Sequence, residues 1–206
     1  MELRYKYPRT PHLPWSPGAS RDDVRLTSLL SFVGRRVVVT EKMDGECTTL
    51  YRDGLHARSI SSGHHPSRSW VKGLQAQMGH LLPSGLRVCG ENLYARHSVA
   101  YDSLPSYFLA FSAWRGDLCL SWDDTERWLV KLGLCSVPIL WRGIFDERAL
   151  RDLVPRGEGH VVRWEGAFDR QLFGDAVAKW VRAGHVVTDK HWMTSQVVPN
   201  GLAQRS

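Results

Sequence analysis

Residues 37–51 read Val-Val-Val-Thr-Glu-Lys-Met-Asp-Gly-Glu-Cys-Thr-Thr-Leu-Tyr, and the interpretation of the whole chain depends on them. Two runs rich in β-branched and aromatic residues flank an Asp-Gly pair, which is typical of two antiparallel strands joined by a tight turn. Lys42 lies at the junction, between Glu41 and Met43. The stretch therefore predicts a β-hairpin that holds a lysine on a stiff element.

Lysine is scarce in this sequence: it occurs at six positions, whereas most basic side chains are arginines. Arginine stays protonated in proteins, but a lysine amine that is removed from water can lose its proton and become a nucleophile. The tetrapeptide Lys42-Met43-Asp44-Gly45 also fits a solvated turn, in which the lysine pairs with Glu41 or Glu46. The motif alone leaves both interpretations open, so the later segments have to decide between them.

Composition places the chain among soluble, basic, single-domain proteins. Its 206 residues suffice for one well-filled domain, and we expect 1–206 to form it, with a Pro-rich basic arm at 1–20 and a short tail at 183–206. The net charge of +6 favours an anionic partner such as a nucleotide or a nucleic acid. Four widely spaced cysteines, and the lack of an apolar run of signal or membrane length, predict a soluble cytoplasmic protein with no membrane partner.

The rest of the chain predicts an α+β domain in which antiparallel sheets are flanked by helices. Prolines between Tyr7 and Gly18 exclude a helix from the arm. Helical periodicity predicts helices over residues 22–32, 67–82, 123–133 and 145–153, with Ser67 and Asp123 as two of the caps. Runs of strand-forming residues predict strands over residues 55–60, 86–93, 107–114, 137–141, 159–164 and 176–181.

Four charged residues stand at or beside predicted strands. Glu91 ends an apolar run, where a carboxylate is costly to bury without a partner or a ligand. Glu158 precedes another apolar strand, Lys179 interrupts the last one, and Arg58 is expected in the middle of a strand. Each also has an ordinary explanation, such as a salt bridge, an acidic turn or a solvated side chain. Together, a nucleophilic lysine, metal-binding carboxylates and phosphate-binding cations are the groups that nucleotidyl transfer requires.

Six segments match the motifs of a known superfamily in the family's order. They are Glu41-Lys42-Met43-Asp44-Gly45, Arg58-Ser59, Gly90-Glu91-Asn92-Leu93-Tyr94, Tyr107-Phe108-Leu109-Ala110-Phe111, Glu158-Gly159-His160-Val161-Val162 and the strand of Lys179. The chain resembles the covalent nucleotidyltransferases, which include ATP-dependent polynucleotide ligases and RNA capping enzymes. More narrowly, it resembles RNA ligases of the phage RNA ligase 2 and RNA-editing ligase type. The resemblance implies a nucleotidyltransferase ligase core with an ATP-grasp-like fold.

The resemblance also implies a site. Lys42 would be the catalytic residue, which attacks the α-phosphate of ATP and becomes lysyl-AMP. The implied nucleotide-binding residues are Glu41 (through its backbone), Met43, Asp44, Gly45, Arg58, Glu91, Phe111 (stacked on the adenine), Glu158, Lys179 and Arg182. Mg²⁺ or Mn²⁺ would be held by Glu158, Glu91 and Asp44. Because an amine attacks only when it is neutral, we expect partial burial and nearby cationic charge to lower the pKa of Lys42.

Three features depart from the family pattern. Val181 stands where a second lysine is common, so Arg182 or the basic arm would have to compensate. Ser112 stands where an aspartate is common, so Phe108 and Phe111 could exchange roles. Residues 183–206 are too few for an OB domain, so the resemblance implies a bare adenylyltransferase core without one. Its own surface, or a partner protein for end healing or strand binding, would then hold the nucleic acid.

The sequence thus predicts an ATP-dependent RNA ligase that joins 5′-phosphate and 3′-hydroxyl ends, acts as a monomer, and has nicked duplexes among its RNA substrates. A small DNA ligase or an end-adenylating enzyme fits the same residues, because phosphate contacts carry no information about the sugar. A further alternative is a non-catalytic nucleic-acid-binding protein, which nine tryptophans and an excess of arginine would suit. The joint presence of Lys42, Glu91, Glu158 and Lys179 argues against it.

Overall fold

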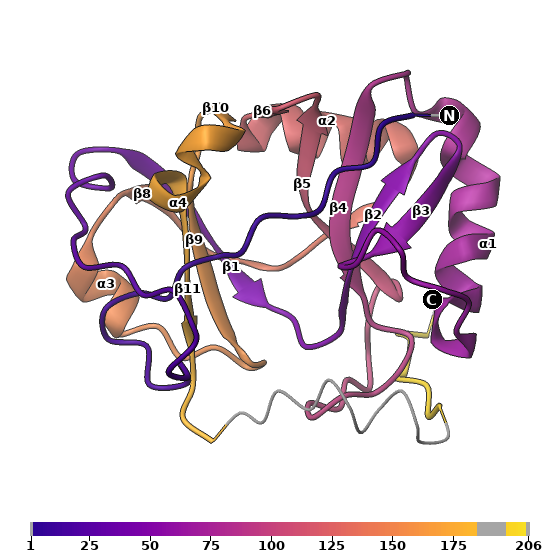
Figure 1. Ribbon diagram of the computed structural model, residues 1–206. Helices are drawn as coiled ribbons and strands as arrows, with labels where there is room; N and C mark the ends of the chain where they lie inside the picture. The colour runs from indigo at the N-terminus through magenta and orange to yellow at the C-terminus, as the bar shows by residue number, and fades with distance from the viewer. Residues whose placement is uncertain (1, 185–196, 205–206) are drawn as a thin grey trace.

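β1 (Arg36–Lys42) contains the first half of the quoted stretch and is an inner strand of a four-stranded antiparallel sheet, which we call sheet A. The computed structural model describes residues 2–184 and 197–204 (Figure 1). The strand order in sheet A is β11 (Val177–Val181), β9 (Gly159–Trp164), β1 and β8 (Ile139–Ile144). Val37, Val38 and Val39 are all fully buried, because both faces of β1 are covered. This is why apolar residues follow one another here without alternation.

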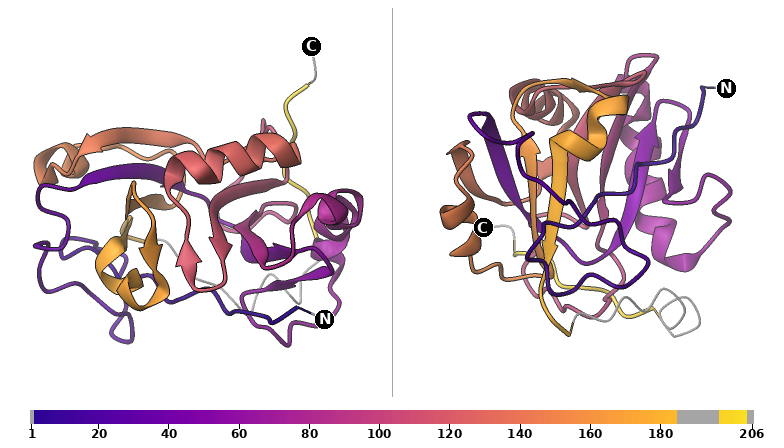
Figure 2. Two further views of the ribbon diagram at one scale, coloured as in Figure 1. Left: turned by 90° about the horizontal axis from the view of Figure 1, so that it is seen from above. Right: turned by 60° about the vertical axis from the view of Figure 1, so that its left-hand side comes forward.

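A larger sheet, sheet B, contains the second half of the stretch. Its strand order is β10 (Phe168–Asp169), β6 (Leu118–Cys119), β5 (Phe108–Arg115), β4 (Leu86–Asn92), β2 (Glu46–Tyr51) and β3 (Gly54–Ala57), and the short β7 (Cys135–Ser136) joins β5 in parallel. The two sheets lie side by side, with α1 and α2 on the outer side of sheet B (Figures 1 and 2). The predicted α+β class built on antiparallel sheets is confirmed.

The predicted hairpin around Lys42 is wrong, because its two strands belong to different sheets. β1 pairs with β8 and β9, whereas β2 pairs with β3 and β4. Met43 is buried in the core between the sheets. Gly45 passes so close to β4 that a Cβ atom would lie 2.6 Å from the Asn92 carbonyl oxygen. The Asp-Gly pair therefore lies in the segment that connects sheet A to sheet B, and Lys42 is the last residue of β1 before this connection.

The described residues form four α-helices. They are α1 (Ser69–Met78), α2 (Trp122–Leu132), α3 (Glu147–Arg151) and α4 (Phe173–Ala176), with 3-10 turns at Pro66–Arg68, Gly79–Leu81 and Arg170–Leu172. Ser121, not Asp123, caps α2, since its hydroxyl accepts the Asp124 N–H at 3.1 Å. Gly133 ends α2 in the left-handed region, as predicted. Across residues 2–184 and 197–204, no helix has the length and apolarity needed to span a bilayer.

The largest error concerns residues 22–32, which form turns and no helix. His12 of the N-terminal arm donates its N–H to the Val24 carbonyl at 2.7 Å and accepts the Leu26 N–H at 2.8 Å. These backbone groups are therefore not available for a helical ladder. Val24 and Leu30, two of the apolar residues whose spacing favoured a helix, are 53% and 80% exposed.

Other boundaries shift by a few residues. The helix predicted over residues 67–82 is α1 with a 3-10 turn at each end, and the one over 145–153 shortens to α3. The strand predicted over 137–141 begins at Ile139, and the strand predicted over 55–60 ends at Ala57. Arg58 thus follows a strand rather than lying within one.

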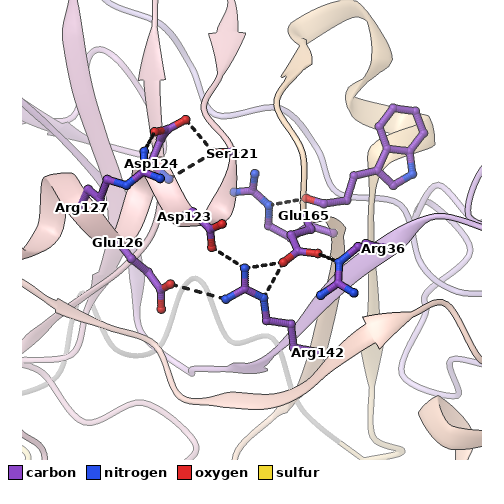
Figure 3. Close-up of polar contacts among 10 residues, drawn as sticks. Arg36, Ser121, Asp123, Asp124, Glu126, Arg127, Arg142 and Glu165 are labelled. Atoms are coloured by element: carbon purple, nitrogen blue, oxygen red, sulfur yellow. Dashed lines mark hydrogen bonds and ion pairs between the residues drawn. The ribbon is translucent and has the colours of Figure 1, made fainter.

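A network of charged side chains ties sheet A to α2 (Figure 3). Arg142 of β8 contacts Asp123 and, at 3.8 Å, Glu126 of α2, and its Nε donates to Glu165 at 2.6 Å. Arg36 of β1 donates to the other carboxylate oxygen of Glu165 at 2.5 Å. Because α2 packs on sheet B, this network helps to fix how the two sheets face each other.

Candidate active site

Lys42 lies at the end of β1, on the face of sheet A that is directed at sheet B. It is paired in register with Gly159, and Thr40, two residues earlier, is paired with Val161. Val161 is paired in turn with Lys179 of β11. Because side chains alternate along a strand, Lys42 and Lys179 share one face, to which Val38 also belongs. Val38 belongs to one core cluster with Leu109 of sheet B and Trp122 of α2, so this face of sheet A is directed at sheet B.

The side chain of Lys42 is paired with Glu158, whose carboxylate accepts from Nζ at 2.5 Å. Both side chains are largely removed from solvent, with 24% and 7% exposed. Burial lowers the pKa of Lys42, but the charges of Glu158 and Glu91 outweigh it, so the pKa is raised above its ordinary value. The expected lowering of the pKa is therefore wrong: Lys42 is a cation that the neighbouring carboxylates stabilise.

Glu91 extends the acidic side of the site from β4. Burial raises its pKa to about 8, although the charge of Lys42 and the Gly45 N–H both lower it. Its backbone is paired with Cys47 of β2 and Leu109 of β5, so the carboxylate is held by an inner strand. A half-buried carboxylate whose pKa is raised by its surroundings is a group that a cationic ligand would stabilise in the ionised form.

Asp44 is bound to a loop that sequence reasoning did not connect with the site. Its carboxylate accepts from the Ser98 hydroxyl at 2.8 Å and from the Val99 N–H at 2.7 Å. Its own N–H donates to the Tyr101 hydroxyl at 2.9 Å. Asp44 thus anchors the loop between β4 and β5 beside Lys42. No pattern in the sequence marks Ser98 or Tyr101, because the contact depends on how the loop folds back.

Glu41 occupies the opposite face of β1 and holds the turn that carries Glu158. Its buried carboxylate accepts the Gly157 N–H at 2.5 Å, and the Glu158 N–H donates to the Lys42 carbonyl at 3.2 Å. Burial raises the pKa of Glu41, while the N–H groups of Gly157 and Arg156 lower it. The Glu41 N–H is taken by the Pro138 carbonyl at 2.8 Å. In this structure, the side chain of Glu41 therefore supports the turn.

Phe111 lies on the side of β5 that faces sheet A, at an irregularity in the pairing of β4 with β5. The register shifts between Cys89 and Gly90, which are paired with Ser112 and Ala110, so Phe111 is left without a direct partner. Phe108 is fully buried in the other core, under α1 and α2. Phe111 therefore lies between the two sheets, and Phe108 does not.

Of the remaining predicted residues, the two arginines lie at the rim of the site. Arg58 and Arg182 are exposed, and the Arg182 N–H donates to the Glu158 carbonyl at 3.1 Å. Burial lowers the pKa of Lys179, and the charges of Lys42 and Arg58 act in the same direction. The structure therefore brings Lys42, Glu158, Glu91 and Lys179 together, with Arg58 nearby.

The donor set fits a divalent cation that also binds the nucleotide. Within residues 2–184 and 197–204, no three His, Cys, Asp or Glu side chains group closely enough to hold a metal alone. Mg²⁺ takes one or two carboxylates and completes its shell with phosphate oxygens and water. Glu158 and Glu91 can supply those carboxylates, whereas Asp44 has its Oδ2 committed to the loop.

The fold is that of the nucleotidyltransferase core found in polynucleotide ligases. The structure is similar to the RNA ligase of Naegleria gruberi with PPi, at 18% identity and a TM-score of 0.57, over 79% of this chain and 53% of that one. It is also similar to a putative ATP-dependent DNA ligase from Aquifex aeolicus, at 18% identity and a TM-score of 0.55, over 87% and 50%. A variant of the Naegleria ligase with ATP and Mn matches at 16% identity and a TM-score of 0.51, over 75% and 52%.

The chain thus spans about half the length of these solved ligases. No curated protein matches it in sequence. A family model described as RNA ligase matches residues 35–181, which is most of the chain, and the chain belongs to this RNA ligase family. The family that the motifs suggested is confirmed. The match begins after the N-terminal arm and ends with β11.

Proposed function

We propose that this chain is the adenylyltransferase domain of an ATP-dependent RNA ligase that joins 5′-phosphate and 3′-hydroxyl ends. The observation that carries the proposal is the contact of Lys42 Nζ with Glu158, on a sheet face shared with Lys179 and beside Glu91. An amine, two carboxylates and a second cation at one point are the groups that nucleotidyl transfer needs. A structural ion pair would need no second, half-buried carboxylate and no second lysine.

In the proposed cycle, Nζ of Lys42 forms a bond with the α-phosphorus of ATP as the bond to pyrophosphate breaks. Nζ donates to Glu158, and this contact has to open and the proton has to leave before the neutral amine attacks. Lys179 would hold the α-phosphate, and Phe111 would stack on the base. AMP then passes from Lys42 to the 5′-phosphate of the RNA, and the 3′-hydroxyl displaces it to form the phosphodiester bond.

Arg58 and Arg182 would contact phosphates or ribose at the rim of the same site. Mg²⁺ or Mn²⁺, bound by Glu158 and Glu91, would neutralise charge on the α-phosphate and on pyrophosphate. Met43 and Gly45 would act through the backbone, since Met43 is buried between the sheets and Gly45 lies against β4.

The test is covalent labelling. Purified protein is incubated with α-labelled ATP and either metal, denatured, and examined for protein-bound label; Lys42→Ala should lose the label. Lys131→Ala, which changes an exposed lysine of α2, is the matched control and should keep it. Label from GTP instead would indicate capping chemistry. No label from either nucleotide in either metal would reject the proposal in favour of a non-catalytic binder.

A DNA ligase is the second candidate, because the fold is similar to that of a putative ATP-dependent DNA ligase. Two nicked duplexes that differ only in having RNA or DNA at the 3′-hydroxyl side separate the two candidates. Faster sealing of the RNA-ended nick is expected. Equal or faster sealing of the DNA-ended nick would favour the second candidate, and adenylated ends that accumulate unsealed would indicate an end-adenylating enzyme.

A further inference from the structure

The N-terminal arm, residues 2–18, precedes the segment that matches the ligase family, yet it crosses both sheets (Figure 1). At sheet B, the Glu2 N–H donates to Asp53 at 3.0 Å, and the Arg4 guanidinium lies 4.2 Å from the ring centre of Tyr51. At sheet A, the arm reaches the free edge of β11. The arm is thus held against the domain at both ends, so it is not the solvated leader that its prolines would also allow.

At sheet A the arm is bonded to the backbone of Lys179. The Lys179 N–H donates to the Pro11 carbonyl at 2.9 Å, and the Leu13 N–H donates to the Lys179 carbonyl at 2.7 Å. Two residues further on, the Gly18 N–H donates to the Val181 carbonyl at 2.9 Å. β11 is thus bonded to β9 on one edge and to the arm on the other, so Lys179 is held as it would be in an inner strand.

Between the sheets, the arm places Tyr7 against Phe111. The two ring centres are 5.2 Å apart and the rings meet edge to face at 71°. Tyr7 also packs edge to face on Phe173 at 5.4 Å and on Trp114 at 6.4 Å. Burial raises the pKa of Tyr7 well above its ordinary value, as expected for a phenol inserted between the sheets. Phe111, which has no direct partner in the sheet, is therefore fixed by the arm.

We infer that the arm is part of the nucleotide site, and that Tyr7 is the positioning residue that sets the ring of Phe111 for stacking on the base. The inference rests on the proposed function, because it gives Phe111 the base-stacking role. It adds that residues outside the family match determine how well the nucleotide binds. An edge-to-face contact restricts the rotation of the partner ring, so less conformational freedom is lost when a base stacks on it.

The test compares Tyr7→Ala with Tyr7→Phe in lysyl-adenylate formation. Tyr7→Ala should raise the KM for ATP about fivefold and change kcat little, which is the effect expected from losing one aromatic pair. Tyr7→Phe keeps the ring and should behave like the unchanged protein. Leu3→Ala, at an arm residue that is 71% exposed, is the matched control and should have no effect.

A double-mutant cycle distinguishes positioning from general destabilisation. Tyr7→Ala should raise the KM for ATP in the presence of Phe111 and should have no further effect in Phe111→Ala, because the residue that it positions is then gone. Equal effects in both backgrounds, or no effect of Tyr7→Ala alone, would overturn the inference. If Phe111→Ala leaves the KM unchanged, the base-stacking role in the proposed function has failed instead. Should Tyr7→Ala not fold, Tyr7→Leu keeps the apolar packing and serves in the same cycle.

Discussion

The carboxylate of Glu158, in contact with Nζ, stabilises the charged form of Lys42. The nucleophile of the proposed reaction is therefore stored as a cation, and its proton must leave before it attacks. Glu158 can hold this position only if the turn before β9 is fixed. The side chain that fixes the turn is Glu41, directly before the nucleophile in sequence and on the other face of β1.

We predict that Glu41→Ala slows lysyl-adenylate formation about tenfold or more, because the Gly157 N–H loses its buried acceptor and the turn is released. Glu41→Gln keeps an oxygen that can accept this N–H, so it should recover most of the rate. The measurement is the rate at which labelled enzyme forms, with the melting temperature recorded in parallel. Full activity in Glu41→Ala would show that only the backbone of Glu41 matters.

At the scale of elements, β9 and β11 approach each other more closely at Gly159 than any side chain would allow. A Cβ atom there would lie 1.9 Å from the carbonyl oxygen of Trp180, which is backbone and has little room to move. Gly159 is paired with both Lys42 and Val181, so this contact sets the spacing of the strands that carry the two lysines. The glycine after Glu158 is thus required by packing as well as by any ligand.

Gly159→Ala should therefore lower the free energy of unfolding by about 3 kcal/mol, at the upper end of the range for overpacked sites. The matched control is Gly174→Ala in α4, where an added Cβ meets nothing within 4 Å and alanine favours the helix. Urea unfolding of both variants checks the prediction. Similar stabilities of the two would mean that the strands can separate at little cost.

At the scale of the whole molecule, stability depends on segments that the arm holds together. His12 is 2% exposed, its Nδ1 is 2.8 Å from the Ser16 hydroxyl, and burial lowers its pKa to about 4. The folded protein therefore keeps this imidazole neutral, whereas the unfolded chain protonates it near pH 6.5. Although burial raises the pKa of Asp23, hydrogen bonds from the Ser20 N–H and hydroxyl hold it well below its usual range, so Asp23, whose Oδ2 is 3.5 Å from Nε2 of His12, stays ionised throughout this interval.

The contribution of His12 to the free energy of unfolding is fully present above pH 6.5. It is lost as the pH falls from there to about 4, because the unfolded chain then binds a proton that the folded protein does not. At pH 5 the loss amounts to about 2 kcal/mol. His12→Asn retains an amide for Ser16 but does not titrate, so its stability should decline less between pH 7 and pH 5. Urea unfolding of both proteins at the two pH values measures the difference. Parallel declines would contradict the assignment to His12.

The family, the α+β class and most of the strands could be predicted from the amino-acid sequence, which also named the candidate site residues. Strands such as β1, β4, β5 and β9 were predictable because runs of β-branched and apolar residues favour an extended, buried backbone over a short range. The motif residues were recognisable because each chemical role admits few side chains. Residues 22–32 were predicted wrongly because pairing with the arm overrides their helical periodicity.

How these residues meet could be read only from the folded structure. It showed that the Lys42 segment crosses between two sheets, that Glu41 binds Gly157, 116 positions away, and that Tyr7 of the arm packs on Phe111. It also decided the charge of Lys42, since the pKa depends on carboxylates that distant segments bring to it. The physical reason is that local sequence sets backbone preference, whereas such contacts depend on how whole sheets pack.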